Sequence, residues 1–408
     1  MARRRDRDRY DVVIAGAGPA GAQCARELAA RDYDVLVLET EREAEFPAGS
    51  DKSTGGTFPS MLRAFDVPDR VVMNHTEYAV LESPSEYYRW ELSGAVLEFA
   101  DFKQFLVDDS REKGAEYRFD ARVHDPVLEG GEVVGVRYDG DQAVYGDVIV
   151  DATGPSAPLA KALGVSDLQR QKQAIGIEYE FEGVDVKNPY YADLTDAMML
   201  RLDEAYAPGG YAWIFHTGAD TAKVGLCYIQ NGDQDRTIDE YLRAWVEEDP
   251  RLATAERVDG TARRGSAHIQ PPGRLSTDNF VAIGDTVPSI DPLWGEGIHK
   301  GMKSARAAAE AVDHCLSPGG PGPSAEHVSR YDELWHEEVA PDAGARRRAS
   351  DLLYRLPDER IDLLLADLDR LGQETLTAAT KGDLRALAKL VNLRDLPLLA
   401  SLAWDVVR

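Results

Sequence analysis

A glycine-rich segment near the start of the chain has the spacing of a nucleotide-binding loop. Residues 16–21 read Gly-Ala-Gly-Pro-Ala-Gly, so glycines occupy the first, third and sixth positions. This spacing lets the backbone turn sharply and approach a pyrophosphate, whose charge then lies at the amino end of the next helix. Glu39 follows at the distance expected for a carboxylate that binds a ribose. The predicted nucleotide contacts are Gly16, Gly18, Pro19, Ala20, Gly21, Glu39 and Thr40.

A second candidate site lies far along the chain, around residue 290. Asp285 ends an apolar run, and a carboxylate at the carboxyl end of a strand can bind a sugar-like hydroxyl group. Residues 295–298 present backbone N–H groups where a helix over 300–315 is expected, and the helix dipole favours electron-rich groups there. A plain strand-loop-helix connection is the alternative. Two such sites on one chain favour a dinucleotide larger than NAD.

Aromatic residues alternate in the segment 208–216. Tyr211, Trp213 and Phe215 would share one face of a strand, because successive side chains of a strand point to opposite faces. They could pack in the core of a sheet or line an apolar cavity, and the spacing alone favours the core. A loop at 51–57 holds Lys52 and the pair Gly55 and Gly56, which suits either close approach to a ligand or an ordinary surface turn.

The elements needed to position these residues can be read from hydrophobic patterning. Around the first loop the order is strand, turn, helix and strand, which makes the glycine pattern a strong indication of a nucleotide-binding α/β unit. Further strands are expected over 76–98, 117–124 and 143–151, with a hairpin over 132–138 and a helix over 102–113. The last strand leads to Gly154, a further backbone position facing the nucleotide.

A second group of elements is expected beyond residue 172. Strands are predicted over 174–182, 211–215 and 223–229, and a helix over 237–248 with Thr237 and Glu240 as a capping box. After a Pro/Gly linker at 318–323, helices are predicted over 329–339, 343–356, 361–371 and, in two pieces, 384–407, with Asp358 and Asp383 as caps. The apolar ending at 398–407 could cover a pocket or touch a membrane, and packing on the body is favoured.

Composition narrows the class of protein. The chain has 408 residues, of which 43% are hydrophobic, so it can form a full globular core in two or three domains. No run of eighteen apolar residues occurs, and the basic start lacks the apolar segment of a secretory signal. The net charge of −26 disfavours nucleic acid and favours a cytoplasmic protein of a high-salt organism over an ordinary acidic protein. Cys24, Cys227 and Cys315 are too far apart to indicate a metal site or a disulfide framework.

Four stretches together resemble the geranylgeranyl reductase family, a branch of the FAD enzymes that include aromatic hydroxylases. They are the start of the chain to Glu39, the strand 147–154, the segment 211–215 and the region 284–304. The order of elements is similar from end to end, and Pro-Leu-Trp-Gly-Glu-Gly at 292–297 is particular to these reductases. Four features depart from the family pattern. Thr54 stands where many relatives have Cys, and His216 where many have Pro. Thr153 precedes Gly154 where an Asp-Gly pair is common, and an Arg often found before the helix at Phe102 is missing.

The resemblance implies an α/β (α+β two-domain) flavoprotein with a Rossmann-like FAD-binding domain, an antiparallel-sheet substrate domain and a C-terminal helical region. The FAD-binding domain would be discontinuous, over 1–75, 97–170 and 262–317, with the substrate domain over 76–96 and 171–261 and the helical region over 324–408. Tyr211 and Trp213 would then line a prenyl cavity. Besides the nucleotide contacts above, the implied cofactor-binding residues are Lys52, Gly55, Gly56, Gly154, Asp285, Pro292, Gly295, Gly297 and Ile298.

The activity expected from this resemblance is reduction of carbon–carbon double bonds in geranylgeranyl chains of lipids or diphosphates. Reduced FAD would supply hydride, and backbone N–H groups at 295–297 would stabilise charge at the flavin. The electron donor would be NAD(P)H or ferredoxin, and contact with the inner face of a membrane is expected with a lipid substrate. Candidate catalytic residues are Tyr211, Trp213, His216, Glu296 and His299.

Two other functions remain compatible with the residues. An FAD monooxygenase of a small aromatic substrate shares the fold, but the aromatic motif and the C-terminal helices argue against it. A flavoprotein that passes electrons to a quinone is the other alternative, weakened because the chain has no cysteine cluster for an iron–sulfur centre.

Overall fold

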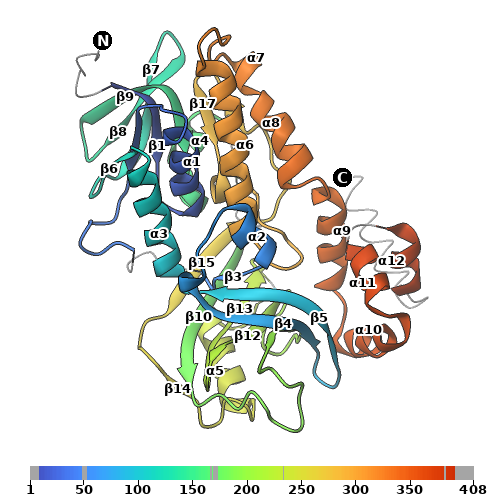
Figure 1. The fold of residues 1–408 in the computed structure, drawn as a ribbon. Coiled ribbons are helices and arrows are strands. Elements are labelled where there is room, and N and C mark those ends of the chain that lie inside the picture. The colour runs from blue at the N-terminus through green and yellow to red at the C-terminus, as the bar shows by residue number, and fades with distance from the viewer. Residues whose placement is uncertain are drawn as a thin grey trace.

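A largely parallel sheet forms the first layer of the molecule (Figure 1). The computed structural model describes residues 9–47, 53–165, 168, 173–232, 234–380 and 383–390. β1 (Arg9–Ala15) lies between β2 (Val35–Leu38) and β9 (Gln142–Asp151), parallel to both, with Val13 opposite Leu36 and Ile149. The path continues through β6 (Glu116–Arg118) on one side and β17 (Phe280–Ala282) and β16 (Ser276–Thr277) on the other. The continuous apolar runs 12–15 of β1, 35–38 of β2 and 148–150 of β9 are fully buried, as their hydrophobicity predicts.

Three helices pack together beside this sheet. α1 (Pro19–Ala29) contacts both α3 (Phe99–Glu112) and α6 (Ile298–Leu316). The buried face of α6 is rich in alanine, including Ala305 and Ala308, and α1 presents Ala22 and Ala25. Small side chains permit close approach of helix backbones, so a helix far along the chain is brought next to the first glycine-rich loop.

A second, mainly antiparallel sheet forms the other layer, in the order β14-β10-β13-β12-β11-β4-β5-β3, with β15 paired to β10. Its strands are β3 (Gly56–Thr57), β4 (Val72–Glu82), β5 (Tyr87–Leu97), β10 (Gln173–Glu182), β11 (Ala197–Arg201), β12 (Gly210–Gly218), β13 (Thr221–Ile229), β14 (Glu256–Arg257) and β15 (Arg263–His268). α5 (Ile238–Glu248) packs against β10 and β13 through a face that includes the fully buried Trp245. It begins at the predicted capping box, in which Thr237 N–H donates to Glu240 Oε2 at 2.8 Å.

Prediction from the sequence missed some strands of this sheet and misplaced the ends of several others. Strands β11 and β15 were not predicted, because neither has a clear alternation of apolar and polar residues. The strand predicted over 117–124 is two strands, β6 and β7 (Val123–Glu129), and β7 forms a hairpin with β8 (Glu132–Tyr138). The mixed α/β architecture itself is confirmed, while the exact domain boundaries stay a prediction.

Short helices complete the fold. Near the second sheet lies α2 (Pro59–Ala64), and after β9 comes α4 (Pro158–Ala162). The chain then ends in α7 (Ala325–Val328), α8 (Arg330–Leu334), a π-helical turn (Trp335–Val339), α9 (Ala343–Leu353), α10 (Asp358–Leu371), α11 (Gln373–Thr380) and α12 (Leu384–Leu390). Pro357, not the predicted Asp358, is the N-cap of α10. The predicted cap at Asp383 is present, since its Oδ1 accepts the backbone N–H groups of Arg385 and Ala386. The predicted helical pieces beyond residue 390 lie outside the described residues.

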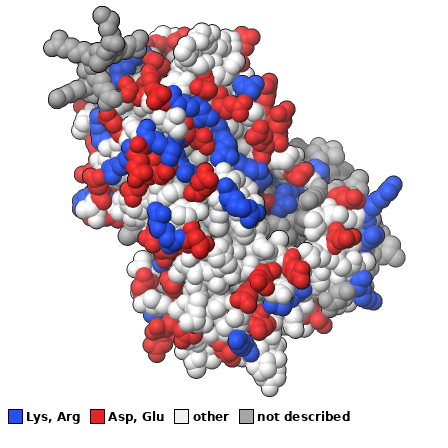
Figure 2. Space-filling view, viewed as in Figure 1, with Lys and Arg blue, Asp and Glu red and all other residues white. Residues whose placement is uncertain are grey.

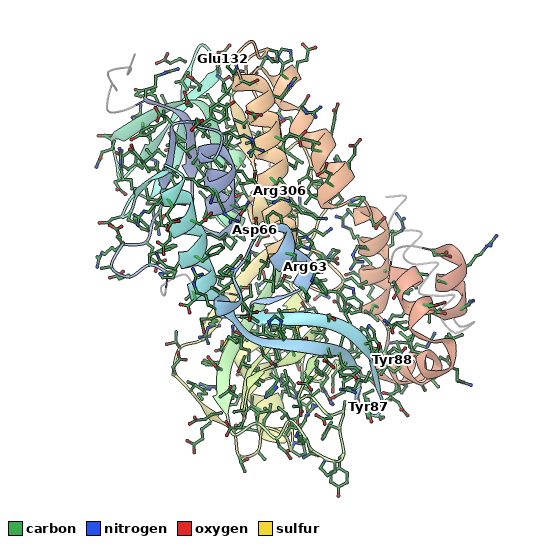
Figure 3. The ribbon with its side chains drawn as sticks, in the orientation of Figure 1. Arg63, Asp66, Tyr87, Tyr88, Glu132 and Arg306 are labelled. Carbon is green, nitrogen blue, oxygen red and sulfur yellow. The ribbon has the colours of Figure 1, made fainter. Side chains whose placement is uncertain are left out.

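α10 packs on the β4–β5 hairpin, whose tip carries Tyr87 and Tyr88 (Figure 3). Leu365 and Leu368 of α10 form an apolar cluster with Leu81 and Tyr88 of the hairpin. Ser83 donates to Asp362 Oδ1 at 2.6 Å and closes the edge of this contact. The C-terminal helices are therefore joined to the second sheet. Over the ranges that the structure describes, no helix combines the length and hydropathy required to span a bilayer.

Charged side chains of both signs are scattered over the visible face of the molecule, with uncharged areas between them (Figure 2). Basic groups gather where α2 meets α6, and Arg63 and Arg306 belong to this band (Figure 3). Arg306 lies over the ring of Phe65, with 4.2 Å from its guanidinium carbon to the ring centroid, and forms a 3.0 Å ion pair with Glu27. Arg306 of α6 thus contacts Glu27 of α1 and Phe65, the residue that follows α2, within an otherwise acidic chain.

Candidate active site

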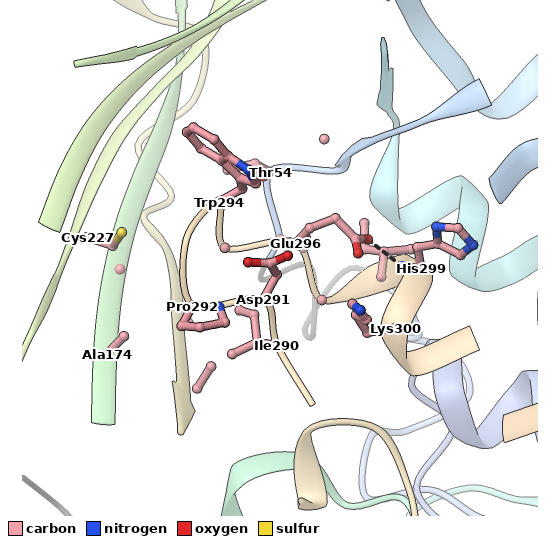
Figure 4. A pocket seen from close by; sticks show the side chains of 18 of the residues that line it. Thr54, Ala174, Cys227, Ile290, Asp291, Pro292, Trp294, Glu296, His299 and Lys300 are labelled. Carbon is pink, nitrogen blue, oxygen red and sulfur yellow. Dashed lines mark hydrogen bonds between the residues drawn. The ribbon is translucent and has the colours of Figure 1, made fainter. Parts of the chain in front are cut away.

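One large cavity lies between the two sheets and the C-terminal helices. Its volume is about 1240 Å³, and its walls come from the first glycine loop, the second sheet, the start of α6 and helices α9 and α11. Figure 4 shows Cys227 on the sheet at one side and Glu296, His299 and Lys300 near the start of α6 at the other. The predicted site residues that line it are Gly18, Pro19, Ala20, Gly56, Gly154, Tyr211, Trp213, Asp285, Pro292, Gly295, Glu296, Gly297, Ile298 and His299.

The glycine loop has the close backbone packing that its sequence predicts. A Cβ on Gly21 would lie 2.0 Å from the carbonyl oxygen of Gly16, and Gly16 itself has a φ of +101°. Glu39 accepts the backbone N–H of Ala17 at 2.7 Å through Oε2 and that of Glu41 at 2.9 Å through Oε1. The carboxylate is therefore fixed at the end of β2, where it can still accept bonds from a ribose.

The second predicted nucleotide segment lies directly against the first. A Cβ on Gly284, whose φ is +57°, would be 2.7 Å from the Cβ of Ala20, so only glycine permits this approach. Asp285 follows, and burial in the cavity wall raises the pKa of its carboxyl group to about 6. None of the hydrogen bonds or ion pairs among the described residues involves this carboxyl group, which leaves it able to bind a polar ligand.

The start of α6 carries two titratable side chains into the cavity. Glu296 Oε1 accepts the backbone N–H of His299 at 2.6 Å, so this carboxyl group caps the helix that Gly297 begins. Burial, with a smaller contribution from Asp291, raises the pKa of Glu296 to about 7. Burial and the nearby Lys303 lower the pKa of His299 to about 4, so its ring is neutral near pH 7.

The aromatic stripe forms a wall of the cavity. Tyr211, Trp213 and Phe215 all line it, whereas Ala212 and Ile214 on the other face of β12 are fully buried in the core of the second sheet. The preference for a core role that spacing suggested is therefore wrong. Spacing shows which residues share a face, but only the packing of α5 on the opposite face decides which face is left for a cavity.

Two glycines make room for these aromatic rings. A Cβ on Gly225 of the neighbouring strand would be 2.5 Å from the indole of Trp213. A Cβ on Gly295 would be 1.9 Å from the Tyr211 hydroxyl oxygen, which donates to the carbonyl of Trp294 at 3.2 Å. Tyr211 thus connects the second sheet to the loop that precedes α6.

Several predicted site residues lie elsewhere. His216 is on the core face of β12, and its ring nitrogens face the carbonyl oxygens of Thr195 and Ala219 at 2.5 and 3.0 Å. Gly55 does not line the cavity but packs against β5, where a Cβ on it would lie 2.5 Å from the carbonyl oxygen of Leu97. Thr40 lines a smaller cavity of about 440 Å³ with Arg42 and Arg122. Lys52 lies outside the described residues.

Some residues of the site were not found from the sequence. Glu178 lines the cavity and accepts the indole N–H of Trp213 at 2.9 Å. Tyr354 of the C-terminal region packs 6.2 Å from Tyr211, ring centre to ring centre, and donates to the carbonyl of Leu293 at 2.7 Å. The buried Lys223 donates to the carbonyls of Thr54 and Leu97, so it connects the loop before β3 to the end of β5. The alternation of β10 could have marked Glu178, but nothing local in the sequence indicates the other two contacts.

Comparisons with known proteins agree on one family. The profile of the geranylgeranyl reductase catalytic domain matches residues 175–261. The chain is 60% identical to the digeranylgeranylglycerophospholipid reductase of Haloferax volcanii over 404 residues, 98% of each chain. The crystal structure of a geranylgeranyl bacteriochlorophyll reductase-like protein from Thermoplasma acidophilum covers 94% of this chain and 100% of its own, with a TM-score of 0.82 and 21% identity.

The fold is also shared with flavin enzymes of other activities. A myxobacterial chondrochloren halogenase, described as FAD-dependent, covers 95% of this chain and 99% of its own, with a TM-score of 0.68 at 19% identity. At that identity the likeness concerns the fold alone. The residues that line the cavity, and not the fold, must therefore decide the reaction.

Proposed function

Because the chain belongs to the geranylgeranyl reductase family, we propose that it is an FAD-dependent oxidoreductase that reduces carbon–carbon double bonds of geranylgeranyl chains in lipids. The observation that carries this proposal is a single cavity that joins the predicted nucleotide segments to the aromatic wall. An apolar prenyl chain and a flavin ring need to meet in such a space, away from water. The relative from Haloferax volcanii, whose name states reduction of a digeranylgeranyl phospholipid, supports the choice of substrate.

The described residues fit FAD. Backbone atoms around Gly16 and Gly21 pack so closely that a side chain there would clash, as expected for a loop that approaches a pyrophosphate. Glu39 would hold the adenosine ribose, and the Asp285 carboxyl group would bind a hydroxyl of the ribityl chain. Backbone from Gly295 to Ile298, at the positive end of α6, would lie along the flavin ring.

When bound there in its reduced form, FAD supplies a hydride to one carbon of the double bond. The aromatic wall would orient the alkene, since Tyr211 and Trp213 are fixed by hydrogen bonds to Trp294 and Glu178. An isolated alkene develops no oxyanion, so orientation and exclusion of water carry much of the catalysis.

We assign the proton for the other carbon to Glu296. Three titratable side chains among the candidate catalytic residues line the cavity near the start of α6: Tyr211, Glu296 and His299. Burial raises the pKa of the Tyr211 hydroxyl well above 10, so it gives up its proton reluctantly, and His299 with a pKa of about 4 is neutral. Glu296, with a pKa of about 7, is partly protonated at neutral pH. It is therefore a stronger acid than Tyr211.

The remaining partners are those expected from the resemblance to the family. With a lipid substrate, the enzyme would contact the inner face of the membrane as a peripheral protein. The electrons would come from NAD(P)H or ferredoxin.

An anaerobic half-reaction tests the proposal. The full chain is purified in high salt, its flavin spectrum is recorded, and the flavin is reduced without oxygen. Geranylgeranylated lipid is then added, and separately oxygen with small aromatic compounds or a quinone. Reoxidation by the lipid, with two hydrogens gained per double bond, is the expected result. Oxygen-dependent hydroxylation or reaction with the quinone alone would instead favour the monooxygenase or the quinone oxidoreductase.

A further inference from the structure

The cavity wall holds five cationic side chains, and they fall into two groups. Arg263, Arg264 and Arg346 each pair with a carboxylate: Glu180 at 3.7 Å, Asp239 at 2.5 Å and Asp291. Lys300 and Lys303 do not take part in any ion pair among the described residues. In a chain of net charge −26, cations without a carboxylate partner need an explanation.

The two lysines are neighbours on one face of α6. They are three residues apart, which places them one helical turn from each other. Lys300 Nζ donates to the carbonyl of Val339 at 2.5 Å, and Lys303 Nζ donates to the carbonyl of Glu338 at 3.2 Å. Each ammonium group has three N–H donors, so both keep donors for a further acceptor. Figure 4 shows Lys300 at the edge of the cavity, near Asp291 and Glu296.

Nearby carboxylates only partly offset this positive charge. Asp291 is neutralised by its ion pair with Arg346, and Glu296, with a pKa of about 7, is partly protonated. Glu338 and Asp342 border the same space but are exposed to solvent. The half-buried lysines therefore present a cationic pair toward the cavity.

The composition of the chain makes this pair unusual. The sequence has eleven lysines among 46 basic residues, yet two of them occupy one turn beside the cavity. At the salt concentrations that the acidic composition suits, exposed charges are screened over a few ångströms, about 3 Å at 1 M. Recognition of an anion in such a solvent requires direct contact with partly buried cations.

We propose that Lys300 and Lys303 form an anion subsite that binds the phosphate of the substrate headgroup, while the prenyl chain extends along the aromatic wall. The inference rests on the proposed function, because it names where that substrate's polar end lies. Lysine suits this role, since a phosphate of a flexible lipid is bound well by compact, rotatable ammonium groups. One phosphate can reach two ammonium groups spaced by one helical turn.

Binding of two matched probes tests the subsite. Geranylgeranyl diphosphate and geranylgeraniol share the prenyl chain and differ in the phosphates. Each is titrated into the flavin-loaded full chain in high salt, and binding is followed by calorimetry. The variants are Lys300→Gln with Lys303→Gln, and the charge-preserving Lys300→Arg with Lys303→Arg. Lys161→Gln is the matched control, because Lys161 also donates to a backbone carbonyl, that of Ser156 at 2.7 Å, but lies outside the cavity wall.

The wild-type protein should bind the diphosphate more tightly than the alcohol. The double glutamine variant should lose about tenfold in affinity for the diphosphate per lysine, with binding of the alcohol unchanged. The arginine variant should keep most of the preference, and the Lys161 variant all of it. Inorganic phosphate added alone should compete only weakly, because it lacks the prenyl chain.

Three results would overturn the subsite. These are wild-type affinity of the double glutamine variant for the diphosphate, equal losses for both probes, or loss of flavin from the variant while prenyl binding persists. Tight binding of inorganic phosphate alone would assign the lysines to a free anion and not to a headgroup. Failure of the proposed function would look different: the preference for the diphosphate would persist, but reduced flavin would not be reoxidised by any prenyl compound.

Discussion

The first glycine loop and the aromatic wall lie in the same cavity but are built in opposite ways. The loop at 16–21 is continuous in sequence, and its contacts are made by backbone atoms that tolerate no side chain at Gly16 or Gly21. The aromatic wall and the start of α6 meet only in the folded chain, through side chains such as Tyr211 and Glu296. Under the proposed function, the first region would bind a cofactor common to many enzymes, and the second would hold the groups that select a reaction.

The difference teaches where specificity resides in this fold. Backbone recognition needs particular glycines at a fixed spacing, so it varies little among proteins that bind the same cofactor. Side-chain recognition can change without altering the fold, which agrees with the presence of halogenases among the structural neighbours. Changes in the two regions should therefore have separable effects on cofactor binding and on turnover.

The largest effect is expected from Gly21→Val. The new Cβ would meet the Gly16 carbonyl oxygen at 2.0 Å, so the loop must move and FAD binding should be lost. The flavin-to-protein ratio of the purified variant measures this. Gly260→Ala is the control, since a Cβ there meets no atom within 4 Å. A variant that still holds a full complement of flavin would show that the loop does not anchor the cofactor.

Glu296→Gln should leave flavin binding intact but lower kcat by about 10²–10⁴-fold, because the amide has no acidic proton to give. The wild-type rate should fall as the pH rises through about 7, where the Glu296 carboxyl group loses its proton, and this decline should be absent in the variant. A pH profile of kcat measures both effects.

The matched control for Glu296 is Glu132→Gln, at the far end of the molecule (Figure 3). It should behave as the wild type does. A Glu296 variant with unchanged kcat and an unchanged alkaline decline would remove this residue from the proton transfer.

Replacing tryptophans on the two faces of the second sheet should separate substrate binding from stability. Trp213→Leu, in the cavity wall, should raise KM for the prenyl substrate by about tenfold through lost apolar contact. Trp245→Ala, in α5 on the other face, should lower the free energy of unfolding by about 3–5 kcal/mol, because its side chain is fully buried. Steady-state kinetics and denaturant unfolding measure the two effects. The comparison fails if Trp213→Leu destabilises the protein as much as Trp245→Ala does.

The smallest effect is expected from Asp285→Asn, which should weaken FAD binding by about fivefold through the loss of a charge-assisted hydrogen bond. It should also change how the flavin-free protein responds to pH. Burial raises the pKa of this carboxyl group from 3.8 to about 6, so the folded state binds the proton more tightly than the unfolded state does. The free energy of unfolding of the wild type should therefore decrease as the pH rises from about 4 to about 6, because the folded state loses its bound proton over this range. Thermal unfolding of the variant should show a smaller decrease. Equal pH dependence of the two proteins would contradict this origin.

Local patterns predicted the elements whose signals are contained in a short segment. The loop at 16–21, the capping box of Thr237 and Glu240, and the helix now seen as α6 were all found from the sequence. His216 shows where such reasoning fails. Its position one residue after Phe215 puts it on the opposite face of β12, but its type made it a catalytic candidate. Strands β11 and β15 were missed because they are stabilised by pairing with β4, β12 and β10 and carry no strong pattern of their own.

The sequence by itself determined the α/β unit around the glycine loop, the alternation of the aromatic stripe and the acidic composition, because each depends only on residue types and their spacing along the chain. Only the tertiary structure decided that the stripe faces a cavity, that Tyr211 reaches over Gly295, and that Lys300 and Lys303 border the same space. The physical reason is that these relations depend on which faces other elements cover. α5 covers one face of the second sheet, and α6 packs against α1 through small residues, so the space left between them is the cavity proposed as the active site.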